Sequence, residues 1–179
     1  MKDEELVKQF HNGSKEAFGE LVQRHSMPLA MMILRLVRDE EVTRDISQSV
    51  FLRAYEAIPR FMMASSFKTW LYSIALNAVR DHLKRRSPIM ACDAPDDLPD
   101  PSQTPAEQLE KARQCPELRK LVEELPMKQR LTLQLRLYEG MDYTEIAKIL
   151  GGTAAGARNN FFHAVKTLQG QVNSNHEKD

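Results

Sequence analysis

Apolar residues recur every three or four positions over most of the chain, the period of an α-helix with one buried face. Leu6 and Phe10 predict a short opening helix, and the next apolar run predicts a long helix over residues 15–37. Asp39 suits the N-cap of a third helix, which Pro59 bounds. The apolar positions of this third helix are Val42, Ile46, Val50, Ala54 and Ala57.

A fourth helix is predicted to follow Ser66, whose hydroxyl can cap it, and to end at residues 83–86. Its apolar face would hold Phe67, Trp70, Leu71, Ile74, Ala75 and Ala78. The sequence therefore predicts a four-helix first domain over residues 1–86.

The helical pattern stops between Ser87 and Pro105, a stretch with five prolines and four aspartates. We expect residues 87–104 to form a flexible acidic linker. Thr104 as N-cap, Pro105 at the first helical position and Glu107 in a capping box would restart helix. The expected fold class is all-α: two small helical domains joined by the linker, the second over residues 105–179.

Pro116 and Pro126 divide the early helices of the second domain, and residues 130–137 then alternate strictly between apolar and polar. Alternation alone favours a β-strand. We interpret the segment as a helix, because a lone strand has no partner in this chain and Leu, Gln and Arg are good helix formers.

Residues 142–168 have the pattern of a helix-turn-helix. Asp142 and Glu145 suit the start of the first helix, a left-handed Gly151 can end it, and Thr153 can cap the second helix. The second helix would bury Ala157, Phe161, Ala164 and Leu168. It would turn Ala155, Arg158, Asn159, Phe162, His163 and Lys166 outward.

Arg158 and Asn159 lie near the start of this second helix, where a recognition helix meets base edges, and Arg–guanine and Asn–adenine pairs are common. An exposed Phe162 would also favour an interface. The spacing alone equally suits an αα-hairpin with a solvated polar face, so both interpretations stay open.

The formal net charge is zero, but residues 57–86 hold six basic side chains and one acidic one. Aromatic residues interleave with these cations, a mixture that suits single-stranded nucleic acid through stacking and phosphate contacts. Two simpler explanations stay open. Lys84, Arg85 and Arg86 could serve only to offset a helix dipole, and Phe67 and Trp70 could be core residues.

Catalytic, metal and cofactor sites are not expected. Cys92 and Cys115 lack metal-ligand or disulfide spacing, the five histidines are scattered, and no glycine-rich phosphate loop occurs. We expect no enzyme activity, no small-molecule substrate and no cofactor. The N-terminus lacks the apolar segment of a signal peptide and no run is long enough to span a bilayer, which predicts a cytoplasmic protein without membrane insertion.

Three segments together resemble a known family: residues 45–61 (DISQSVFLRAYEAIPRF), 65–86 (SSFKTWLYSIALNAVRDHLKRR) and 124–151 (ELPMKQRLTLQLRLYEGMDYTEIAKILG). In this order they are similar to the extracytoplasmic-function (ECF) type RNA polymerase sigma factors of the sigma-70 family. The resemblance implies a factor that binds core RNA polymerase and directs promoter recognition, DNA melting and transcription initiation.

By this resemblance the first domain corresponds to sigma region 2. Its third helix would bind the β′ coiled coil of core polymerase through Asp45, Gln48, Leu52 and Arg53. Ser49 departs from the family, in which an acidic residue is usual, so one polar contact to polymerase would be weaker or replaced.

The resemblance also places melting and reading of the minus-ten element on residues 60–86. The loop from Phe61 to Ser66 would hold a base flipped from the non-template strand. The implied contacts are Arg60, Phe61, Ser66, Lys68, Trp70, Asn77, Arg80, Lys84 and Arg85.

The second domain resembles sigma region 4, whose helix-turn-helix reads the minus-thirty-five element in the major groove. The implied contacts are Thr153, Ala155, Arg158, Asn159, Phe162, His163 and Lys166. Residues 155–160 replace a family pattern with more cations, which predicts weaker phosphate anchoring. The resemblance further implies a β flap contact, passage of the linker through the RNA channel, and an anti-sigma factor partner.

Two other hypotheses compete with the sigma factor. A stand-alone helix-turn-helix regulator needs only the second domain and predicts tight duplex binding without polymerase, usually as a dimer. A helical adapter that binds only protein predicts that reversing the charges of Arg80, Lys84 and Arg85 leaves function intact.

Overall fold

The structure is a computed structural model that describes residues 1–86 and 116–176, and every element within these ranges is a helix. The chain divides into two compact units, Met1–Cys92 and Asp93–Asp179. The all-α, two-domain prediction is confirmed. The predicted linker at 87–104, the cap at Thr104–Glu107 and both cysteines lie outside the described residues, so the linker limits stay predictions.

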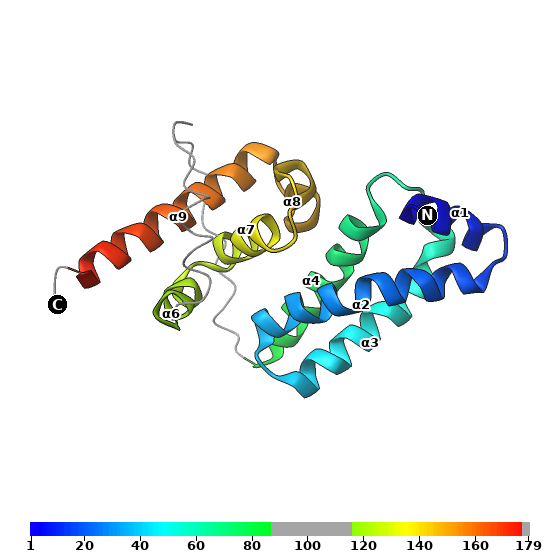
Figure 1. Ribbon diagram of the computed structural model, residues 1–179, viewed down its shortest axis with the longest axis horizontal. Helices are drawn as coiled ribbons and strands as arrows, with labels where there is room; N and C mark the ends of the chain where they lie inside the picture. The colour runs from blue at the N-terminus through cyan, green and yellow to red at the C-terminus, as the bar shows by residue number, and fades with distance from the viewer. Residues whose placement is uncertain (87–115, 177–179) are drawn as a thin grey trace. The chain divides into compact units, whose positions relative to one another are not determined.

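The first unit contains α1 (Asp3–His11), α2 (Lys15–Val37), α3 (Glu40–Ala57), the 3-10 helix η1 (Ile58–Arg60) and α4 (Phe67–Arg86). The four α-helices agree with the sequence prediction, and η1 is an addition at Pro59. Helices α2 and α3 pack side by side, and both pack against α4 (Figure 1). The core between them includes Leu21, Ile33, Val50, Leu71 and Tyr72.

The helix starts of the first unit follow the predicted caps. The Asp39 carboxylate accepts a hydrogen bond from the Val42 amide at 3.0 Å, and the Ser66 hydroxyl accepts one from the Thr69 amide at 3.1 Å. Two predicted core positions of α3, Val42 and Ala57, are only partly buried. Thr43 is buried instead, and its hydroxyl donates a hydrogen bond to the Asp39 carbonyl at 2.7 Å.

A polar network joins α1 to α2 at the edge of this core. Asp3 accepts hydrogen bonds from Arg24 at 2.6 Å and pairs with His25 Nε2 at 2.7 Å. His25 is buried and its ring lies 5.5 Å from the ring of Phe67, so α1 is tied to the segment that begins α4. His11 adds a second tie, since its Nε2 lies 2.8 Å from the Ile58 carbonyl oxygen.

The second unit contains α6 (Pro116–Glu124), α7 (Met127–Leu137), α8 (Tyr143–Leu150) and α9 (Ala154–His176). Helix α9 packs against the other three, and its core cluster is Leu125, Leu133, Phe161, Ala164, Val165 and Leu168. Residues 131–135 are all buried in α7. Because residues 130–137 lie within α7, the helical interpretation of the alternating segment is confirmed, and the apolar and polar positions of 131–135 are buried alike.

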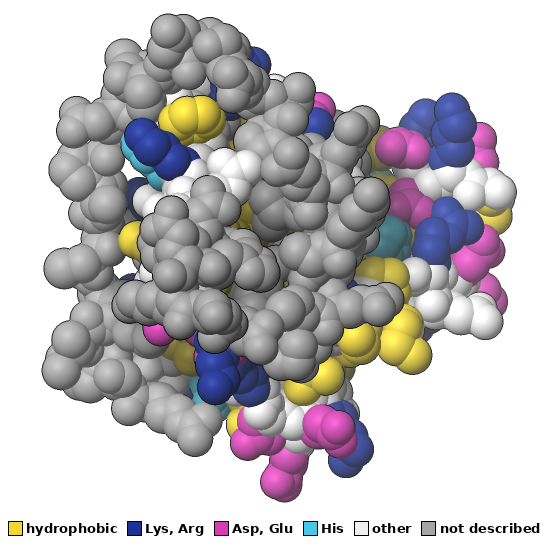
Figure 2. Space-filling model, turned by 60° about the vertical axis from the view of Figure 1, so that its left-hand side comes forward, with side chains coloured by type: hydrophobic (Ala, Val, Ile, Leu, Met, Phe, Trp, Pro, Cys, Tyr) yellow, Lys and Arg dark blue, Asp and Glu magenta, His cyan; other side chains and the backbone are white. Residues whose placement is uncertain are grey.

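Where Figure 2 leaves described residues uncovered, charged and apolar side chains are interspersed on their surface. The exposed large hydrophobic residues are Met1, Met27, Met31, Leu52, Tyr55, Met62 and Tyr138. Within the described ranges, no helix combines the length and apolar character needed to cross a membrane.

Candidate nucleic-acid interfaces

One side of α4 carries a stripe of aromatic, amide and cationic side chains. Trp70, Asn77 and Lys84 repeat every seven residues, and Arg80 lies between the last two on the same side. Asn77 and Lys84 are exposed, whereas Trp70 and Arg80 are partly buried. The helical repeat thus brings together four of the predicted minus-ten contacts, and we call these residues the α4 stripe.

Two other predicted contacts on α4 lie away from this stripe. The helical repeat places Lys68 on the opposite side of α4, where its ammonium group lies 5.5 Å from the centre of the buried Tyr72 ring. Arg85 is exposed but lies roughly 100° around the helix from Lys84. The structure therefore does not assemble all the predicted cations into one surface.

Trp70 is held by two other rings. Phe61 stacks on it with ring centroids 4.6 Å apart and planes inclined by 23°, and Phe67 packs against it at 5.6 Å. Phe61 and Phe67 are buried. The core explanation therefore holds for Phe67 and extends to Phe61, whereas Trp70, which both rings fix, remains partly accessible. Binding of single-stranded nucleic acid stays a prediction.

The loop between η1 and α4 is anchored at both ends and exposed in the middle. Phe61 fixes its start, and Ser66 fixes its end through hydrogen bonds to the Thr69 amide and hydroxyl. Between them Met62 is 89% exposed, and Met63 has a φ of +53°, which is uncommon for a residue other than glycine. Arg60 is exposed beside the loop. A short, fixed loop with an apolar tip thus lies next to Trp70.

The outward face of α3 holds the four residues implied for polymerase binding. Asp45, Gln48, Leu52 and Arg53 are all exposed, and Leu52 keeps 60% of its surface accessible. A single exposed leucine is common on protein surfaces, so Leu52 by itself does not mark an interface. Ser49 lies on the same face and is partly buried.

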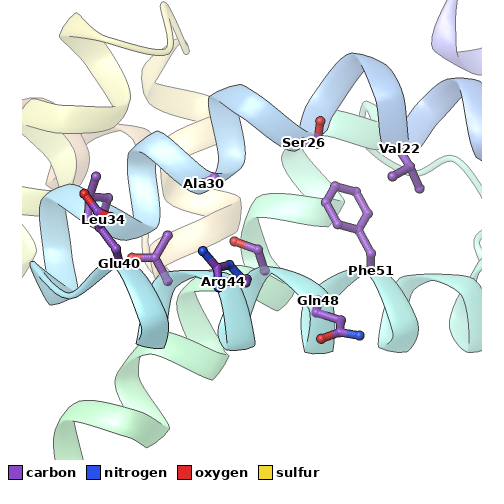
Figure 3. A pocket seen from close by; sticks show the side chains of 10 residues that line it. Val22, Ser26, Ala30, Leu34, Glu40, Arg44, Gln48 and Phe51 are labelled. Atoms are coloured by element: carbon purple, nitrogen blue, oxygen red, sulfur yellow. The ribbon is translucent and has the colours of Figure 1, made fainter.

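An apolar groove of about 370 Å³ runs between α2 and α3 beside this face (Figure 3). Phe51 points from α3 toward α2, and Gln48 lies at the outer edge of the groove. The exposed Met27 and Met31 belong to the same helix as the α2 wall. The exposure of these methionines could not be read from the sequence, because the pattern of an amphipathic helix does not show whether a neighbouring helix covers a given apolar residue.

The second unit contains the predicted helix-turn-helix. Asp142 and Glu145 form a capping box at the start of α8, with amide-to-carboxylate distances of 2.8 and 3.0 Å. Gly151 and Gly152 make the turn with φ values of +76° and +120°. Gly151 has a ψ of 140°, so its backbone has positive φ without the left-handed helical conformation that we predicted. The Thr153 hydroxyl accepts from the Gly156 amide at 3.0 Å and caps α9.

Helix α9 buries and exposes the faces that the sequence predicted. Its four predicted core residues are buried. On the outward face, Ala155, Arg158 and Lys166 are exposed, together with Thr153 at the cap. Asn159, Phe162 and His163 are partly buried, so Phe162 is less exposed than expected, and its ring packs edge-on against His163 at 5.9 Å.

Tyr143 contacts the candidate recognition helix, and the sequence analysis did not single it out. The guanidinium of Arg158 lies 5.7 Å from the centre of the Tyr143 ring, and that of Arg136 lies 5.0 Å from it. These residues come from α9, α8 and α7, so only tertiary packing brings them together.

Within residues 1–86 and 116–176, no group of three His, Cys, Asp or Glu side chains could hold a metal ion.

The comparisons with known proteins agree with this geometry. The family described as Sigma-70 region 2 matches residues 21–89, and the family described as Sigma-70, region 4 matches residues 116–168. Each match falls on one of the two units. A stand-alone helix-turn-helix regulator would account for the second match only.

Relatives match over nearly the whole chain. RNA polymerase sigma-H factor of Pseudomonas aeruginosa is 32% identical over 177 residues, which cover 93% of this chain and 92% of the relative. ECF RNA polymerase sigma-E factor of Escherichia coli is 31% identical over 182 residues, which cover 96% and 95%.

Solved structures share the fold. The structure of CnrH in complex with the cytosolic domain of CnrY has a TM-score of 0.72 at 27% identity, covering 96% of this chain and 97% of that one. The sigma factor RpoE of Bartonella quintana, solved with the anti-sigma factor NepR, has a TM-score of 0.67 over 87% and 96% of the two chains, and at 19% identity this likeness concerns the fold alone. With both family matches and relatives above 30% identity over nearly its full length, the chain belongs to the ECF sigma factors of the sigma-70 family, which direct RNA polymerase to promoters.

Proposed function

We propose that this sigma factor divides its task among three surfaces: the outward face of α3 binds core polymerase, the α4 stripe with the loop at 61–66 opens and reads the minus-ten element, and α9 reads the minus-thirty-five element. The observation that carries the proposal is the α4 stripe, where a fixed and partly exposed Trp70 lies in line with Asn77, Arg80 and Lys84.

The α4 stripe has the chemistry that a separated DNA strand requires. An accessible aromatic ring can stack on an unpaired base, and cations along the same line can hold successive phosphates. Phe61 contributes by fixing Trp70, since its own ring is buried, and Ser66 contributes by fixing the loop. Lys68 and Arg85 act outside the stripe, as general positive charge near the strand.

Helix α9 is proposed to read base edges with few cations. Arg158 and Asn159 lie in its first turns, where a recognition helix enters the major groove. Lys166 is the other cation on the outward face and would hold a phosphate. With so few cations, duplex affinity would depend weakly on salt, and holoenzyme assembly would supply most of the binding.

The α3 face is proposed to receive a helix of the polymerase β′ subunit. Leu52 would supply the apolar contact, and Asp45, Gln48 and Arg53 the polar rim. The second unit would contact the β flap. The absence of an acidic side chain at Ser49 would weaken one polar contact, as the family pattern implies.

The proposal also concerns regulation and location. CnrH, whose fold is similar, was solved in complex with the cytosolic domain of CnrY. This complex supports the proposal that an anti-sigma factor also binds this chain. Because its sigma factor relatives work with RNA polymerase, we place the protein in the cytoplasm and assign it no catalytic step of its own.

Run-off transcription with reconstituted holoenzyme tests the division of labour. The double variant Arg80→Glu with Lys84→Glu should lower transcription more than about tenfold, because two phosphate contacts become repulsive. Permanganate reactivity of minus-ten thymines should fall with it, while binding to core polymerase should stay unchanged.

The matched control is Lys8→Glu with Lys15→Glu, which changes the net charge equally at exposed positions on α1 and α2. This control should transcribe normally. An equal loss of transcription in both double variants would show that the effect comes from net charge rather than from the α4 stripe. Full transcription by the α4 variant would support an adapter that binds only protein.

A further inference from the structure

Two guanidinium groups contact the ring of Tyr143, the first residue of α8. Arg158 of α9 lies 5.7 Å from the ring centre, and Arg136 of α7 lies 5.0 Å from it. Both distances fall in the range in which the negative face of an aromatic ring attracts a cation. Arg158 is one of the residues proposed to read the minus-thirty-five element, so its surroundings bear directly on how the site works.

The Tyr143 ring is itself fixed. It is partly buried, packs against the core cluster of the second unit, and makes an edge contact with Phe161 at 6.1 Å between centroids. The capping box of Asp142 and Glu145 fixes the backbone on which the ring is mounted. The ring therefore offers Arg158 a rigid surface.

The two arginines differ in how they are held. Arg136 Nη1 donates a hydrogen bond to the Met141 carbonyl at 2.9 Å, which ties that guanidinium to the loop before α8. Arg158 is exposed, and among residues 1–86 and 116–176 no carboxylate forms an ion pair with it. Within those ranges the Arg158 guanidinium is thus not tied to a carboxylate.

We propose that Tyr143 is a positioning residue for promoter recognition: its ring holds the Arg158 guanidinium ready for a base edge. The inference rests on the proposed role of α9. A long, exposed arginine side chain loses conformational freedom when it binds, and an orientation set in advance lowers that loss. Because holoenzyme assembly is proposed to supply most of the binding, the orientation of Arg158 would matter more for base discrimination than for overall affinity.

A double-mutant cycle tests the inference on full-length protein in holoenzyme. The variants are Tyr143→Leu, Arg158→Ala and the combination, each measured on a native promoter and on promoters with single substitutions in the minus-thirty-five element. The readout is the ratio of affinities for native and substituted DNA. This ratio is taken within one protein preparation, so it does not depend on the folded fraction.

We expect Arg158→Ala to lower discrimination at one or two adjacent base pairs. Tyr143→Leu should lower discrimination at the same base pairs by about two- to fivefold, the range of a partly exposed cation–π contact. Adding Tyr143→Leu to Arg158→Ala should change nothing further. Tyr143→Phe keeps the ring and should stay within about twofold of native, and Tyr138→Leu, an exposed tyrosine outside this contact, is the matched control.

Each other result has a definite meaning. Unchanged discrimination in Arg158→Ala would show that α9 does not read DNA through this residue, so the proposed function would fail at this site. A loss in Arg158→Ala without a loss in Tyr143→Leu would overturn the positioning role alone. A Tyr143→Leu effect that persists in the Arg158→Ala background would also overturn it, since the ring would then act through another group.

Discussion

The two units present their candidate DNA contacts in different ways. In the first unit the α4 stripe comes from one helix, so residues seven apart fall on one side whatever surrounds them. In the second unit the candidate contacts also lie on one helix, α9, but Arg158 contacts a Tyr143 ring that belongs to α8 and that Arg136 of α7 contacts as well. A surface built on one helix therefore tolerates small shifts in how that helix packs. A contact that joins three helices depends on how accurately those helices pack against one another.

The units also differ in how their helices are joined. In the first, the polar network of Asp3, Arg24 and His25 links α1 to α2 beside the core. In the second, Arg130 of α7 donates a hydrogen bond to the Glu123 carbonyl of α6 at 3.2 Å, and the apolar cluster around Phe161 packs α9 against the helices before it. Substitutions in the two units test how far these differences go.

The largest effect is expected from Leu71→Ala in the core of the first unit. Leu71 has no exposed surface, and removing its side chain should lower the free energy of unfolding by about 2–5 kcal/mol. Trp70 is the only tryptophan in the chain, so tryptophan fluorescence during urea unfolding reports on the first unit. The matched variant Leu168→Ala in the second unit should leave the fluorescence transition unchanged. It should shift only the unfolding transition that far-ultraviolet circular dichroism reports for the second unit. Equal shifts of the fluorescence transition would show that the units unfold together.

A smaller loss is expected from Asp3→Ala. This change leaves the buried ring nitrogen of His25 without its partner at 2.7 Å, which should cost about 1–3 kcal/mol. The lost pair with Arg24 should add little, because that side chain is 36% exposed. Urea unfolding followed by tryptophan fluorescence measures the change. Glu4→Ala, an exposed neighbour in α1, should stay near the native value, and an equal loss in both variants would contradict a structural role for the network.

The smallest effect is expected from Asp142→Ala at the start of α8. Loss of the hydrogen bond from the Glu145 amide should cost about 1 kcal/mol and speed hydrogen exchange at that amide. Asp39→Ala removes the equivalent cap of α3 in the first unit and should cost a similar amount. If the Glu145 amide exchanged at its native rate in the Asp142 variant, packing of α8 rather than its cap would determine where the helix begins.

The helices and their caps could be predicted from the sequence, because capping and amphipathic periodicity are local properties. The predicted caps that the structure confirms are Asp39, Ser66, Asp142 and Thr153. It also determined which side of α9 faces outward, since that side follows from the spacing of the buried residues. The charge of the α4 stripe was equally readable.

Which side chains from different helices contact one another follows only from the tertiary structure. It buried Phe61 against Trp70 and left Met27 and Met31 of α2 exposed. It also brought Arg136, Tyr143 and Arg158 together. The physical reason is that each of these outcomes depends on the angle and distance at which separate helices pack, and those are set by the fit of whole cores rather than by the pattern within one segment.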